Sequence, residues 1–88
     1  MPRLTAHQLE EALQLLARGS WQDAHRIVQQ DEGSPLACWV HGVVHVLEGD
    51  LDNARYWYRR AGRAFPADID VQTEVQALRE ALGGTGAS

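Results

Sequence analysis

The sequence predicts an all-α fold of two stacked helix-turn-helix hairpins followed by a C-terminal capping helix. Apolar residues recur at intervals of three and four residues in five segments, and no stretch alternates as a β-strand does. The segments GSWQDAHR and GDLDNARY are similar in kind and lie 30 residues apart. A fixed repeat favours stacked hairpins, because each hairpin needs a neighbour to bury its apolar face.

The first hairpin is predicted from two capping signals. Thr5 can cap a first helix with Gln8 as its capping-box partner, and Ser20 can cap a second helix with Asp23 in the same role. Gly19 separates the two helices. Their apolar stripes consist of Leu9, Ala12, Leu13 and Leu16, then Trp21, Ala24, Ile27 and Val28.

The second hairpin begins at Ser34-Pro35, an N-cap followed by a proline at the first helical position. From residue 36 to 47 nearly every side of the third helix is apolar, which is typical of a central helix covered on several faces. Asp50 then caps a fourth helix that is predicted to reach about Ala64.

Small residues in this hairpin predict close helix packing. Gly42 would let two helices approach closely, and Ala54 and Ala61 would keep a flat seam on the fourth helix. Gly49 is expected to end the third helix, and Pro66 to stop the hairpin.

The chain is expected to close with a fifth, amphipathic helix capped by Asp68 or Asp70. Its apolar positions are Ile69, Val71, Val75, Leu78 and Leu82. Residues 83–88 are small and have nothing to bury, so we expect one domain over residues 1–82 and a flexible tail over 83–88.

Composition argues against several partner classes. The net charge of −4 gives no general attraction to nucleic acid or anionic membranes, and no apolar run approaches the length of about 20 residues that spans a bilayer. The N-terminal residues lack the apolar segment of a signal peptide, and the single cysteine, Cys38, fits a reducing compartment. We therefore expect a cytoplasmic protein. All eight basic residues are arginine, which suggests a GC-rich bacterial genome.

The second hairpin resembles a tetratricopeptide repeat. That family spaces Trp-x2-Leu-Gly-x2-Tyr, Ala-x3-Phe and Pro over about 34 residues. The corresponding positions hold Cys38, His41, Gly42, His45, Ala54, Tyr58 and Pro66, and the first hairpin matches at Ala12, Leu15, Gly19, Ala24 and Val28. The resemblance implies a non-enzymatic protein-interaction or scaffold module. The run EGDLDNARYWYRRAG is also similar to a stretch of small bacterial helical proteins, which implies no activity.

Two surfaces are candidates for binding a protein or peptide. Arg55, Arg59 and Arg63 form a four-residue ladder with Arg60 beside it and Tyr56 and Trp57 interleaved. This face is either solvated and paired with Asp52, Asp68, Asp70 and Glu74, or it binds an acidic partner; nucleic acid is the weaker alternative.

The second candidate surface is a groove around Trp39 and Val43, on the side of the third helix that lines the concave groove of the resembled family. The fifth helix or a second copy of the chain would cover it, as in a homodimer, or a peptide would bind there.

A metal site is the alternative function. Cys38, His41, His45 and Glu48 are spaced three, four and three residues apart and share one helix face. His41 and His45 could share a zinc-like ion, whereas Cys38 and Glu48 lie about 15 Å apart along the axis and cannot both bind it. The alternative is two neutral histidines hydrogen-bonded to Tyr56, Tyr58 or the backbone.

Catalysis has little support in the sequence. There is no glycine-rich phosphate loop, no nucleophile motif and no paired-acid pattern, so we expect neither enzyme activity nor a cofactor. His7 and His25 are expected on exposed helix faces.

Overall fold

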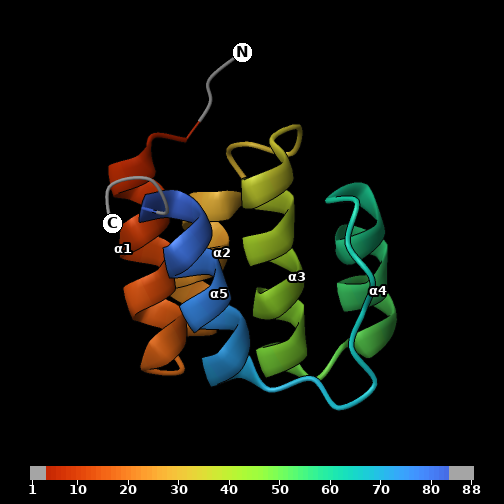
Figure 1. Cartoon of the computed structure of the whole chain (residues 1–88). Helices are drawn as coiled ribbons and strands as arrows, with labels where there is room; N and C mark the ends of the chain where they lie inside the picture. The colour runs from red at the N-terminus through yellow and green to blue at the C-terminus, as the bar shows by residue number, and fades with distance from the viewer. Residues whose placement is uncertain (1–3, 84–88) are drawn as a thin grey trace.

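The computed structural model describes residues 4–83 and confirms the all-α class, with five helices and no strand among these residues (Figure 1). The helices are α1 (Ala6–Ala17), α2 (Trp21–Val28), α3 (Pro35–Glu48), α4 (Leu51–Arg60) and α5 (Val71–Gly83). Gly83 thus ends α5, while residues 84–88 of the predicted tail lie outside the described part. No helix within residues 4–83 is both long and apolar enough to cross a lipid bilayer.

Helix α3 is the centre of the fold, because it packs against each of the other four helices. The hairpins α1–α2 and α3–α4 lie side by side, with α2 behind and α5 in front of the row formed by α1, α3 and α4 (Figure 1). Helix α5 packs on α1 and α3, the first helices of both hairpins. It therefore covers one face of the stack and does not extend the row beyond α4.

Repeated glycines end the first helix of each hairpin in the same way. Gly19 and Gly49 have φ angles of 82° and 91°, in the left-handed region that glycine adopts without a steric penalty. After Gly49, the backbone N–H of Asp50 donates to the carbonyl of His45 at 2.9 Å. This bond reaches back five residues and is the 6→1 hydrogen bond of a Schellman motif.

Helix α4 ends at Arg60, so the predicted end at about Ala64 is wrong. Gly62 has a φ of 77°, and the N–H of Arg63 donates to the carbonyl of Tyr58 at 3.0 Å. A glycine with positive φ therefore ends α4, as in α1 and α3, four residues before Pro66.

The predicted N-caps are formed in part. Thr5 and Gln8 make the reciprocal bonds of a capping box, at 3.1 and 2.9 Å, and Asp70 caps α5. Ser20 precedes α2 but its side chain makes no capping bond, so the capping box predicted with Asp23 is wrong. The Asp23 carboxylate instead pairs with an arginine of α2 on the helix surface.

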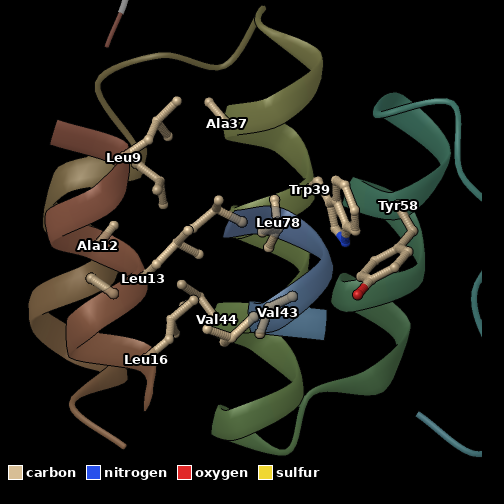
Figure 2. Packing of buried hydrophobic residues seen from close by; sticks show 14 residues of the cluster. Leu9, Ala12, Leu13, Leu16, Ala37, Trp39, Val43, Val44, Tyr58 and Leu78 are labelled. Carbon is tan, nitrogen blue, oxygen red and sulfur yellow. The ribbon is translucent and has the colours of Figure 1, made fainter. Parts of the chain in front are cut away.

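The core surrounds α3, in which residues 37–45 are all buried. Figure 2 shows Leu9, Leu13 and Leu16 of α1 on the side of that helix that faces α3, with Leu9 near Ala37 and Leu16 near Val44. This confirms the sequence expectation of a central helix covered on several faces. Ala24 and Ala54, which correspond in the two repeats, are both fully buried, as close packing of the hairpins requires.

Gly42 is the point of closest approach between α3 and α4. A Cβ atom at this position would lie 2.5 Å from Cδ1 of Tyr58 and 3.3 Å from the carbonyl oxygen of Ala54. The Tyr58 ring cannot move away easily, because it is buried and its hydroxyl donates to Glu74 at 2.6 Å.

Replacing Gly42→Ala should therefore destabilise the protein by about 1–3 kcal/mol, the usual cost of overpacking a core, despite the higher helix propensity of alanine. Urea unfolding monitored by circular dichroism measures the loss. Gly33→Ala is the control, since nothing lies within 4 Å of a Cβ at Gly33. Equal stability of the two variants would mean that α3 and α4 do not pack this closely.

Candidate functional site

Three histidines from two helices meet beside α3. His41 and His45 lie one turn apart on α3, and His25 reaches them from α2. The ring centroids are 4.9 Å apart for His25 and His41, 5.5 Å for His25 and His45, and 5.0 Å for His41 and His45. One ligand-capable nitrogen of each histidine lies within 4.8 Å of the others, and we call these residues the three-histidine cluster.

The expectation that His25 lies on an exposed helix face is wrong, because its side chain is partly buried against α3. Trp21, Ala24, His25 and Val28 occupy the i, i+3, i+4 and i+7 positions of α2. This spacing is that of a core-facing stripe and could have predicted the location. Histidine is a polar residue type that is fully buried less often than valine or leucine, which is why its place in this stripe was not predicted.

His41 is the most constrained member of the cluster. Its side chain is buried, and its ring stacks on Trp57 of α4 with centroids 3.8 Å apart and an interplanar angle of 8°. Its Nδ1 atom is buried and has no hydrogen-bond partner among residues 4–83. The hydrogen bond expected from Tyr56, Tyr58 or the backbone is therefore not made to this nitrogen, and a buried nitrogen that lacks a partner carries an energetic cost.

Burial keeps two of the imidazoles neutral. Desolvation, with smaller contributions from the neighbouring His45 and His25, lowers the pKa of His41 from 6.5 to about 3. The pKa of His25 is also lowered, chiefly by burial and then by His45. Both rings are therefore in the neutral form that binds metal ions at pH 7.

His45 has a carboxylate partner on its own helix. The Nδ1 atom of His45 lies 2.7 Å from Oε1 of Glu48, three residues further along α3. His45 is 9% exposed in its side chain and Glu48 37%, so the pair joins the edge of the buried cluster to the surface.

Cys38 lies on the same face of α3 but is not part of the cluster. Its Sγ donates to the carbonyl of Glu32 at 3.4 Å, away from the histidines. Burial raises the pKa of the Cys38 thiol, although Arg60 nearby opposes this shift. The thiol is therefore protonated at neutral pH, and its contact with the Glu32 carbonyl keeps it outside the three-histidine cluster.

The cluster fits a small metal ion after a modest adjustment. Two nitrogens bound to one tetrahedral zinc lie about 3.3 Å apart, because each Zn–N bond is about 2.0–2.1 Å. The nitrogens of the cluster fall within 4.8 Å, so closure requires shifts of the order of 1 Å in side-chain position. His25, which is only partly buried, can supply this movement, while Trp57 holds the His41 ring in place.

The predicted arginine ladder is not formed on one helix, because α4 ends at Arg60 and only Arg55 and Arg59 lie on it, whereas Arg63 follows it and covers the Trp39 ring. Arg55 pairs with Asp52 at 3.1 Å, as the alternative of a self-paired face predicts. Arg60 donates to the carbonyl oxygen of Glu32 at 2.7 Å and lies over the Trp57 ring. These two side chains are therefore held against the protein's own surface.

The predicted groove around Trp39 and Val43 is filled by α5. Trp39 is 4% exposed and Val43 is fully buried. The indole N–H of Trp39 donates to Glu74 of α5 at 3.1 Å, and the Arg63 guanidinium lies 3.5 Å over the same ring. Covering by the fifth helix was one of the alternatives left open by the sequence. A partner could reach Trp39 and Val43 only if α5 moved.

Tyr56 and Arg59 lie on the exposed side of α4, where the Tyr56 hydroxyl accepts a hydrogen bond from Arg60 at 3.3 Å. Tyr56 is 44% exposed and Arg59 is also exposed. The interleaved Trp57 is only 8% exposed, because it turns inward to stack on His41. The expected basic and aromatic surface is therefore smaller than the sequence suggested.

Metal-free protein should lose stability as the pH falls below 6.5. The pKa of His41 lies lower in the folded chain than in the unfolded chain, so the unfolded state takes up more protons as the solution becomes acidic. One such histidine contributes a slope of at most about 1.4 kcal/mol per pH unit, and His25 contributes in the same direction.

Urea unfolding between pH 7 and pH 5 measures this slope. In His41→Phe, which keeps an aromatic ring against Trp57, the slope should be smaller by up to about 1.4 kcal/mol per pH unit. The same slope in both proteins would mean that His41 is not held neutral by the fold.

Comparison with known proteins gives no information about this site. No protein-family model, curated protein or solved structure matches the chain. The resemblance to tetratricopeptide repeats therefore stays a prediction based on residue spacing. The three-histidine cluster, by contrast, rests on distances, burial and one buried nitrogen without a hydrogen-bond partner.

Proposed function

We propose that this protein binds a divalent transition-metal ion at His25, His41 and His45. The observation that carries the proposal is the convergence of three imidazole nitrogens within 4.8 Å of one another, one ring having a buried Nδ1 without a partner. A bound ion would give the cluster a common acceptor for its lone pairs and would remove the cost of crowding imidazoles in a dry environment.

The chemistry of the ligands favours zinc and its neighbours. Neutral imidazole suits zinc, copper(II), nickel and cobalt, whereas calcium and magnesium prefer oxygen ligands. The Cys38 thiol is buried and directed elsewhere, so the site is not of the thiolate-rich structural type. Three histidines resemble in number the ligand sets of open zinc sites, in which a water completes the coordination.

The contacts favour metal binding over partner binding as the first function to test. Arg55 of the ladder and the adjacent Arg60 are engaged by groups of the same chain, and the groove residues lie beneath α5. A protein-interaction role stays a prediction for the exposed residues Tyr56 and Arg59.

Metal binding would also stabilise the fold, because the ligands come from two helices. An ion bound by His25 of α2 and by His41 and His45 of α3 links the first hairpin to the second. A ligand present at 100 times its dissociation constant stabilises the native state by about 2.7 kcal/mol if the unfolded chain does not bind it.

The experiment is a zinc titration of chelator-treated protein without an affinity tag. We expect one zinc per chain and an increase in the melting temperature with zinc concentration. His25→Ala should weaken binding at least tenfold with little loss of folding, since His25 is the least buried ligand. His7→Ala is the matched control, because His7 is an exposed histidine of α1 outside the cluster. Cobalt(II) can then report the coordination number by visible absorption.

Two results would contradict the proposal. The first is the absence of stoichiometric zinc or cobalt in the untagged protein by titration and elemental analysis. The second is equal metal affinity in His25→Ala and His7→Ala, which would place any bound ion elsewhere.

A further inference from the structure

We infer that Glu48 is the positioning residue of this centre: it holds His45 so that Nε2, and not Nδ1, faces the metal. The inference rests on the proposed function and assigns to Glu48 a place outside the coordination sphere. The sequence analysis had offered Glu48 only as a ligand.

The hydrogen bond decides which nitrogen of His45 carries the proton. An ionised carboxylate can only accept, so the contact of 2.7 Å between Nδ1 and Oε1 requires Nδ1 to donate. In a neutral imidazole the other nitrogen, Nε2, then keeps its lone pair free. A histidine that donates one N–H to a carboxylate and binds metal through the other nitrogen is both oriented and made more basic.

The positions of the acidic groups separate Glu48 from the ligand set. Glu48 groups with His45 and Asp50 within 4.8 Å, but it does not join the group that contains His25 and His41. Among residues 4–83 no fourth side chain completes the three-histidine cluster. An ion there would have three protein nitrogens as ligands, with Glu48 behind His45.

The carboxylate also acts on the cluster through its charge. Glu48 partly opposes the lowering of the pKa of His25, so its negative charge interacts with a second histidine of the cluster. The same field favours a bound cation. Glu32 exerts a similar influence on His25 but makes no hydrogen bond to an imidazole, so it separates the effect of charge from that of positioning.

The test combines tautomer and affinity in the full chain. Imidazole nitrogen shifts of metal-free, 15N-labelled protein should show His45 with its proton on Nδ1. Glu48→Leu should abolish this preference and raise the zinc dissociation constant by about 10- to 100-fold. Glu48→Gln keeps an oxygen acceptor and should retain the tautomer with a smaller loss of affinity. Glu32→Gln, the charge control, should retain the tautomer and most of the affinity.

The outcomes distinguish this inference from the proposed function. Wild-type protein that binds no metal overturns the metal site itself. If wild-type protein binds zinc but Glu48→Leu changes neither the His45 tautomer nor the affinity, the positioning role is wrong and the metal site stands. A lower coordination number of cobalt in Glu48→Leu would make Glu48 a ligand and would also overturn the inference.

A further variant tests the neighbouring acidic group. Asp50→Asn keeps a residue that can cap α4 and should leave zinc affinity unchanged. If Asp50→Asn weakens binding and His25→Ala does not, the ion lies between His45, Glu48 and Asp50, and both the three-histidine site and the positioning role are wrong.

Discussion

The burial of residues 37–45 of α3 governs how the other helices pack. The helix contacts all four of its neighbours, and only its two ends reach the solvent. Any polar side chain in this stretch must therefore find its partners inside the protein. His41 and His45 lie in it, and the groups that surround them are determined by how α2 and α4 pack on α3.

Buried polar side chains find different kinds of partner on the two sides of α3. Toward α5, Trp39 and Tyr58 both donate to the carboxylate of Glu74, so one acidic group connects three helices. Toward α2, the imidazoles meet one another, and the Nδ1 atom of His41 is buried without a hydrogen-bond partner in the described part of the chain. The polar groups on the α5 side are paired with one another, whereas a buried nitrogen on the α2 side is not, and the proposed function concerns that second side.

The size of the chain makes a metal link between the hairpins physically reasonable. A domain of 88 residues buries a limited core, and small domains often gain stability from a metal ion or another cross-link. The cluster joins α2 to α3, the helices at which the first hairpin meets the second. Occupancy of the site would therefore affect the stability of the stack as well as the chemistry of the histidines.

Local sequence signals were enough to predict the helices, because caps, glycines and apolar spacing act within a few residues of one another. These signals predicted the all-α class, the starts of α1 and α3, and the central position of α3, and they singled out His41 and His45. The end of α4 was missed because Gly62 was not recognised as a stop. Long-range packing brings His25 into the cluster and places α5 over Trp39, and neither contact could be read from local spacing. Both depend on which faces of distant helices meet, and this is a property of the packed chain as a whole.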